Sequence, residues 1–499
     1  MHLAPTRAPG SGGGPLENNV TSMLVRGLKE GWTKGSVIAV DAGVQLAAIT
    51  KILQDTQPEG LGTTVSLPYR LEEGPFAGVE IQSNSAMVNA GSILRWIIDT
   101  FLVTHPHLDH ISGFVINTAG PPGARPKRLV GTSSTISAIK THIFNNVIWP
   151  NLSDENNGAG LVTFLRLVEG GSPAIGDGNS KGYLELTDSL AVKLFSVSHG
   201  HCIERHLARG SVASLRYSSF DASAAAGSPR GAPGSTAASG PPSLFRGSNA
   251  GQDKETISVY DSSAYFIRDN ESGREILIFG DVEPDTMSLS PRNLHIWEEA
   301  APRIANGNLA AIFIECSYDN SQSDDRLFGH LTPRYLVQEL QTLAATVETV
   351  ALPQTTTEST KKRKRATEAG ANTTDTSSSA NGDDRAISPK SVRPVKKPTS
   401  ITAGPDRSGI DTPHIVTPTA EMSLRDIEAD MSPHTQVPLI PKGSNALKGL
   451  KVVVIHVKDK LVDGALPGDV ILAQLLEAEE EAQLGCQFII SRAGQSFLF

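Results

Sequence analysis

The chain has 499 residues and a formal net charge of −9, so it exceeds one ordinary domain and its charge predicts no nucleic-acid partner. Its apolar runs stay shorter than the ~18 residues of a membrane span, and its three cysteines are too few for a disulfide framework. We therefore expect a cytoplasmic protein that binds neither nucleic acid nor a membrane.

Hydropathy and composition predict one α/β domain that two insertions interrupt. Its three parts are expected at residues 1–208, 256–353 and 448–499. The first insertion, 209–255, is dominated by Ala, Gly, Ser and Pro, and the second, 354–447, has almost no aromatic side chains. Such compositions bury too little apolar surface to offset the entropy of ordering, so we expect both insertions to be disordered.

Apolar spacing predicts strands and helices in the first part. Residues 36–40 form a short apolar run, and residues 190–197 alternate apolar and polar side chains, as a half-buried strand does. Residues 88–103 are rich in Ile, Leu and Trp and lead into a histidine-rich segment. Residues 133–149 have the apolar spacing of a helix.

The later parts continue this pattern. Strands are predicted at 258–267, 275–279, 309–314, 452–455 and 487–490. The run at 309–314 is continuously apolar, which indicates a strand that is buried on both faces. Thr332 and Pro333 are a typical helix start, and an acidic helix is expected at 471–482.

The second insertion carries five consecutive cations at Lys361–Arg365. An accessible basic run is what a nuclear-import receptor requires, although a solvated charged linker is an equal alternative. Ser388 and Thr412 precede proline, so a proline-directed kinase is a second expected partner. Each phosphorylation would add about −1.5 to −2 charges near the basic run.

The most informative segment places four potential metal ligands within six residues: His105, His107, Asp109 and His110. Imidazole nitrogens and carboxylate oxygens are ligands that zinc and similar metals prefer. Four ligands this close cannot all reach one ion from a straight strand or helix. The spacing therefore predicts a tight turn beside two neighbouring ions, which could activate water and stabilise a phosphoryl displacement.

Three later residues extend this set. His199, Asp281 and His456 each follow an apolar strand, the position at which an open sheet collects ligands. His201 lies two residues beyond His199 and competes with it for the same role.

The segment from His105 to Gly113 resembles the metal motif of the metallo-β-lactamase fold, and with Leu108 it resembles the fungal-type class II cyclic-nucleotide phosphodiesterases more narrowly. The glycines at 12–14 and the sequence Asp41-Ala42-Gly43 match the same family. The resemblance implies an αββα sandwich of two mixed sheets flanked by helices, here with two disordered insertions.

The same resemblance implies how the ligands are shared. His105, His107 and His199 would bind the first ion, and Asp281 would bridge to the second. Asp109, His110 and His456 would complete the second site. Two divalent ions are therefore expected, with zinc as the first choice.

The implied reaction is hydrolysis of cyclic AMP to the 5′-nucleotide in cAMP signalling, with cyclic GMP as a further candidate substrate. A hydroxide shared by the two ions would attack phosphorus, and Asp109 would orient it. His330, with Glu315 as its partner, would protonate the departing 3′ oxygen, since a carboxylate raises the basicity of a histidine. A homodimer is one expected assembly.

Two alternatives stay open. A tRNA 3′-processing endonuclease shares the fold, but the predicted folded parts lack a basic stripe for RNA. A non-enzymatic nuclear adaptor would use the second insertion, but such a scaffold has no need of seven metal ligands.

Overall fold

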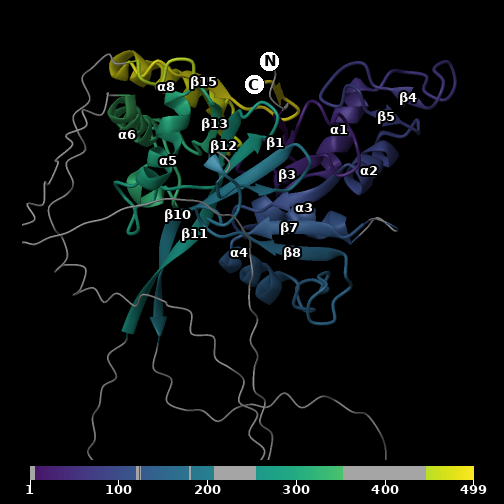
Figure 1. Cartoon of the computed structure of the whole chain (residues 1–499), viewed down its shortest axis with the longest axis horizontal. Helices are drawn as coiled ribbons and strands as arrows, with labels where there is room; N and C mark the ends of the chain where they lie inside the picture. Colours follow the sequence, from purple (N-terminus) through teal and green to yellow (C-terminus); the bar gives the residue numbers. More distant parts are fainter. Residues whose placement is uncertain (1–5, 120–122, 124, 179–180, 207–253, 352–444) are drawn as a thin grey trace, which may run out of the picture. The chain divides into compact units, whose positions relative to one another are not determined.

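The computed structural model describes residues 6–119, 123, 125–178, 181–206, 254–351 and 445–499 (Figure 1). Lys361–Arg365, Ser388 and Thr412 lie outside the described residues, as do nearly all of the two predicted insertions. The described chain resumes at Lys254 and at Asn445, which are two and three residues before the predicted starts of the second and third parts.

The first sheet joins strands from both ends of the chain. Its order is β16-β1-β2-β3-β6-β7-β8. Pairing is antiparallel from β16 to β3 and parallel from β3 to β8. The strands are β1 (Thr6–Gly10), β2 (Ser22–Arg26), β3 (Val37–Ala42), β6 (Ile98–Leu102), β7 (Lys127–Gly131), β8 (Val162–Arg166) and β16 (Ser496–Phe497).

The second sheet has the order β15-β14-β13-β12-β11-β10-β9. It is parallel from β15 to β12 and antiparallel from β12 to β9. The strands are β9 (Leu184–Glu185), β10 (Leu190–His206), β11 (Lys254–Asp269), β12 (Glu275–Phe279), β13 (Leu309–Glu315), β14 (Lys451–Ile455) and β15 (Gln487–Ile490). A separate two-stranded sheet pairs β4 (Tyr69–Arg70) with β5 (Glu80–Ile81).

Helices cover the outer face of each sheet, so the fold is the predicted αββα sandwich (Figure 1). The first sheet packs against α1 (Leu46–Thr56), α2 (Ala86–Trp96), α3 (Leu108–Thr118) and α4 (Ser133–Ala138). The second packs against α5 (Asn293–Ala305), α6 (Pro333–Ala351) and α8 (Pro467–Ala482). Within the described residues, no helix combines the length and apolarity needed to cross a bilayer.

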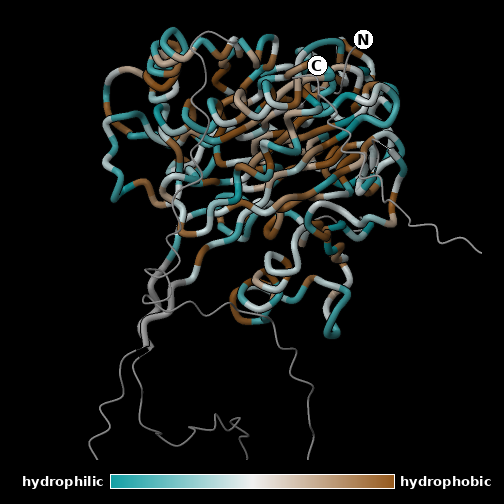
Figure 2. The backbone as a smooth tube through the Cα atoms, turned by 60° about the vertical axis from the view of Figure 1, so that its left-hand side comes forward, coloured by the Kyte–Doolittle hydropathy of each residue, from teal (hydrophilic) through white to brown (hydrophobic). Residues whose placement is uncertain are grey.

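A third apolar cluster fills the space between the two sheets. Val40 and Leu102 of the first sheet and Ile278, Phe313 and Val453 of the second are fully buried there. Figure 2 shows the corresponding apolar strand segments in the interior, with polar segments in the outer loops. The strands β12 and β13 are buried at every position, which explains why their sequences are almost continuously apolar rather than alternating.

The structure resolves an apolar stretch that had no predicted element type, residues 88–103, and shortens the helix predicted at 133–149. Residues 88–103 divide into α2, whose first turn is capped by Ser85, and the strand β6. The predicted helix at 133–149 gives way to a π-helical turn at Ile139–Ile143 and then ends. The Asn145 side chain accepts hydrogen bonds from the backbone of Val147 and Ile148, which favours a turn over further helix.

Candidate active site

The histidine-rich segment crosses from a loop into a helix. It leaves β6 at Leu102, and His107 occupies the N-cap position of α3 with an extended backbone. Asp109 and His110 therefore lie in the first helical turn, whereas His105 and His107 project from the loop before it. The predicted tight turn is thus a loop followed by a helix start, and this change of backbone direction separates the four side chains into two pairs.

Two of the later candidates follow parallel strands of the second sheet. Asp281 follows β12 and His456 follows β14, and Glu315 is the last residue of β13 between them. The carboxyl ends of these parallel strands meet at one sheet edge, so the three side chains are brought close together.

His199 is positioned differently from the sequence prediction. The sequence predicts that it follows a strand, and this is wrong because β10 continues through it to His206. The pairing of β10 with β11 shifts between Ser198 and His201, and Gly200 has a φ of 76°. This bulge bends the strand, so that His199 is buried against Asp281 while His201 is exposed.

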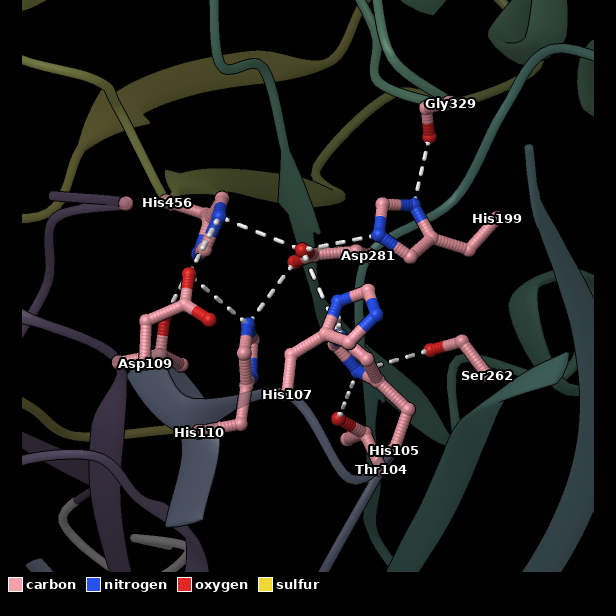
Figure 3. Close-up of polar contacts among 12 residues, drawn as sticks. Thr104, His105, His107, Asp109, His110, His199, Ser262, Asp281, Gly329 and His456 are labelled. Carbon is pink, nitrogen blue, oxygen red and sulfur yellow. Dashed lines mark hydrogen bonds and ion pairs between the residues drawn. The ribbon is translucent and has the colours of Figure 1, made fainter. Parts of the chain in front are cut away.

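The first cluster contains His105, His107, His199 and Asp281. His105 Nε2 lies 3.0 Å from His107 Nδ1 and 3.7 Å from Asp281 Oδ2. His199 Nε2 lies 3.5 Å from the same carboxylate oxygen. Figure 3 shows these side chains converging on Asp281 from one side.

The second cluster contains Asp109, His110, His456 and again Asp281. His110 Nε2 lies 3.3 Å from Asp281 Oδ1, and His456 Nε2 lies 3.3 Å from Asp281 Oδ2. Asp109 Oδ2 is 3.8 Å from His110 Nε2 and 3.6 Å from His456 Nε2. Asp281 is therefore shared by both clusters, at the centre of Figure 3.

These residues fit divalent metal ions. Zinc ligands at about 2.0–2.2 Å in a tetrahedron are separated by roughly 3.3–3.6 Å, which is close to the spacings in both clusters. His110 Nε2, His456 Nε2 and Asp281 Oδ1 are buried without a hydrogen-bond partner. Buried polar atoms normally have partners, so three orphaned ligand atoms facing one another indicate a cation site.

Electrostatics keep most of the imidazoles in the form that binds metals. Burial lowers the pKa of His105 and His456 well below the usual value and that of His107 to about 4. For Asp281, burial alone would raise the pKa, but His456 and His110 hold it well below the usual value. Neutral imidazoles around an ionised carboxylate are the donor set that a divalent metal requires.

His110 is the exception among these histidines. Burial alone would lower its pKa, but the carboxylates of Asp281 and Asp41 raise it well above the usual value. His110 Nδ1 lies 2.8 Å from Asp41 Oδ2, so Asp41 fixes the ring and leaves Nε2 directed at the cluster. Asp41 also accepts hydrogen bonds from the backbone and hydroxyl of Thr104, which anchors the loop of the motif.

Asp41 and Thr21 are supporting residues that the sequence analysis does not identify. Asp41 belongs to the Asp-Ala-Gly match at the end of β3, but the match gives it no role. Thr21 Oγ1 lies 2.7 Å from His456 Nδ1. Hydrogen bonds to the outer nitrogen of a metal-binding histidine set its tautomer and orientation, so both residues belong to the site.

Close packing explains why glycine occupies positions 13 and 43, in the two short stretches that match the family. A Cβ atom on Gly43 would lie 1.8 Å from the carbonyl oxygen of Asp109, and one on Gly13 would lie 2.6 Å from the His456 ring. The backbone therefore approaches the ligand-bearing segments too closely for any larger residue at either position.

His330 and Glu315 form a buried pair beside the clusters. His330 Nδ1 lies 2.8 Å from Glu315 Oε1, and Glu315 is fully buried. The backbone of Val282 and the hydroxyl of Ser317 donate to the same carboxylate. The His330 ring lies 4.8 Å from that of His199. The pair thus reaches the edge of the candidate metal centre with its geometry fixed from behind.

Comparisons with known proteins identify the family to which the chain belongs. A sequence model of the class-II cAMP phosphodiesterases matches residues 5–362 and 436–494. A 3′,5′-cyclic-nucleotide phosphodiesterase of Schizosaccharomyces pombe is 31% identical over 68% of this chain and 75% of its own length. 3′,5′-Cyclic-nucleotide phosphodiesterase 1 of Saccharomyces cerevisiae is 26% identical over 67% of this chain and 81% of its own length.

The crystal structure of unliganded yeast PDE1 superposes with a TM-score of 0.58 at 20% identity, covering 100% of both chains, which supports the fold. The family model covers more than two thirds of the chain and includes every candidate ligand. The Schizosaccharomyces pombe relative covers 68% of the chain. The chain belongs to the family of class-II cAMP phosphodiesterases.

Proposed function

We propose that this protein hydrolyses cyclic AMP to the 5′-nucleotide, and accepts cyclic GMP, with two zinc ions at the site described. The observation that carries the proposal is the meeting of six ligand side chains around a seventh, Asp281, with the His330–Glu315 pair beside them. Membership of the class-II family supports the cyclic nucleotide as substrate.

The two clusters suggest how the ions are held. His105, His107 and His199 would bind one ion, Asp109, His110 and His456 the other, and Asp281 both. Bound divalent ions supply Lewis acidity toward phosphoryl oxygens and lower the pKa of water. The protein's contribution is a preformed donor set in which all the ligands except His107 and Asp109 are buried.

His330 is proposed to hold the proton that the leaving 3′ oxygen needs. The Glu315 carboxylate contacts Nδ1 and fixes the ring, so the other ring nitrogen is the one that can deliver a proton. Val282 and Ser317 hold Glu315 in turn, which prevents the pair from rotating away.

Asp109 is proposed to orient the attacking water. Its side chain is 30% exposed, whereas those of His110 and His456 are almost fully buried. Asp109 can therefore reach solvent and the second cluster at the same time. A carboxylate in this place accepts a hydrogen bond from water and directs its lone pair toward phosphorus.

The test is a comparison of substrates with the zinc-loaded protein. Cyclic AMP and cyclic GMP should give 5′-nucleotides, identified by phosphorus NMR, whereas a pre-tRNA should remain uncut. Cleavage of the pre-tRNA without turnover of either cyclic nucleotide would support the endonuclease alternative. A metal-bound protein that is inactive on all three would favour the adaptor.

We further propose that the basic run Lys361–Arg365 directs some of this cytoplasmic protein to the nucleus through an import receptor, under proline-directed phosphorylation at Ser388 and Thr412. The support is the sequence alone, since these residues lie outside the described part of the chain. Equal distribution of tagged wild-type protein and a variant with all five cations changed to alanine would refute this. Light scattering would test the expected homodimer.

A further inference from the structure

We propose that a cavity beside the candidate metal centre binds the nucleobase, and that Phe328 is the surface on which the base stacks. The cavity has a volume of about 390 Å³, within the range of small-ligand sites. His199 and His330 both line it, so it adjoins the candidate active site. This inference deepens the proposed function and rests on it for the position of the phosphate.

The charged side chains around the cavity indicate which part of the nucleotide binds there. Its lining includes Glu283, Asp324 and Asp325 and neither Lys nor Arg, while from outside the lining Arg334 pairs with Asp324 and Arg326 lies 3.9 Å from Asp325. A phosphate would find no Lys or Arg in this lining, whereas the neighbouring clusters would attract it once cations are bound. The cavity is therefore suited to the uncharged end of the substrate, where the amino groups of adenine or guanine can donate to carboxylates.

Aromatic side chains give this cavity flat apolar surfaces. Phe328 is 70% exposed, and Tyr260 from β11 is 45% exposed. The Tyr260 ring lies 6.1 Å from that of His107, which places it between the cavity and the first cluster. Stacking on an aromatic side chain is the common way to hold a base, because every base has an aromatic face.

The backbone shows that Phe328 is held in place rather than merely left exposed. Its φ is 53°, a conformation that is strained for an aromatic residue. The next residue, Gly329, packs so tightly that a Cβ atom there would lie 2.6 Å from Gly200 N. The Gly329 carbonyl also lies 2.9 Å from His199 Nδ1. Such strain persists where the surroundings enforce it, and it is concentrated at binding sites.

This contact links the base to the chemistry. His199 is a candidate metal ligand, and its outer nitrogen is fixed by the residue that follows Phe328. His330 comes two residues after Phe328, with its backbone N–H bonded to the carbonyl of Leu327. A short segment therefore carries the stacking ring, the ligand-orienting carbonyl and the proposed proton donor.

Two probes separate the base from the phosphate. Titration calorimetry measures the Kd of 5′-AMP and of ribose 5-phosphate, which lacks the base, for the zinc-loaded protein. Wild type should bind 5′-AMP at least tenfold more tightly. In Phe328→Ala and Phe328→Leu the Kd of 5′-AMP should rise about tenfold, which is the affinity that the stacking of one base contributes. The Kd of ribose 5-phosphate should change much less. Phe328→Tyr should restore tight binding.

The control is Leu476→Ala, which removes an exposed side chain from α8, outside the cavity lining, and should change neither Kd. Equal binding of the two probes by wild type, or equal losses for both in Phe328→Leu, would overturn the inference. Preferential binding of 5′-AMP by a zinc-loaded protein that does not hydrolyse cyclic AMP would instead support the base pocket and refute the proposed function.

Discussion

At the scale of single residues, Asp281 is the carboxylate common to both clusters. Asp281→Ala should abolish hydrolysis of cyclic AMP and reduce bound zinc at both sites. His107→Ala removes a ligand from the first cluster alone, so the ion of the first cluster should be bound more weakly than the ion of the second. Metal analysis and circular dichroism of both variants would test this, and normal turnover in either would contradict the ligand assignment.

Asp41 should act through His110 without touching the substrate. Asp41→Asn weakens the hold on His110 Nδ1 and on the Thr104 backbone. Loss of such a supporting carboxylate typically lowers metal affinity by about 10–100-fold. Competition with a coloured zinc chelator would measure the change, and activity should return when excess zinc is added. Unchanged zinc affinity would show that the His110 ring is held by the ligand cluster alone, without help from Asp41.

His330 should differ from the metal ligands. His330→Ala should retain both ions while kcat on cyclic AMP falls by roughly 10²–10⁴, the usual contribution of a general acid. A nitrophenyl phosphodiester should lose much less, because its leaving group needs no proton. Equal losses on both substrates would argue against proton donation. Glu315→Gln should give an intermediate loss and a shifted pH profile, as expected for a positioning residue.

At the scale of secondary-structure elements, a buried carboxylate joins α6 to the segment after Asp281. Glu339 accepts hydrogen bonds from Trp297 Nε1 of α5 and from the backbone of Asp285. Burial, with the nearby charge of Asp285, raises its pKa from 4.5 to about 7. Between pH 4.5 and about 7, Glu339 is protonated in the folded state but ionised in the unfolded chain. The free energy of unfolding should therefore decrease as pH rises through this range.

The loss between pH 4.5 and 7 should approach about 3 kcal/mol for this group. Urea unfolding at pH 5 and pH 8 would measure it. Glu339→Gln should flatten the dependence, yet cost about 1–3 kcal/mol at pH 5, since one of two buried donors loses its acceptor. Glu348→Gln, a less buried position on the same helix, is the control. An unchanged slope in Glu339→Gln would refute this assignment.

The elements also show what can be predicted from sequence. Asp281 and His456 follow continuously apolar strands, and such runs are visible in a single chain. The bulge that orients His199 toward Asp281 is not visible in the sequence, because it arises from the pairing of β10 with β11. The role of Asp41 and the identity of Thr21 were likewise hidden, since their partners are 69 and 435 residues away in the chain.

At the scale of the whole molecule, the described chain resumes at Asn445, within the last three residues of the second predicted insertion. Replacing residues 354–444 with a short Gly/Ser linker should leave kcat/KM for cyclic AMP within about twofold, because closure entropy varies only slowly with loop length. By contrast, Leu447 is fully buried in the core, so Leu447→Ala should cost about 2–5 kcal/mol. A folded but inactive linker variant would show that the removed segment shapes the site.

The central claim is that hydrolysis of a cyclic nucleotide depends on the metal centre built around Asp281. The most direct measurement is the rate of cyclic AMP hydrolysis, with zinc per chain determined on the same samples, before chelation, after chelation and after zinc is restored. We expect activity to fall and return in proportion to bound zinc, reaching its maximum at two ions per chain. Undiminished hydrolysis by the metal-free protein, or no hydrolysis by the fully loaded protein, would contradict the account.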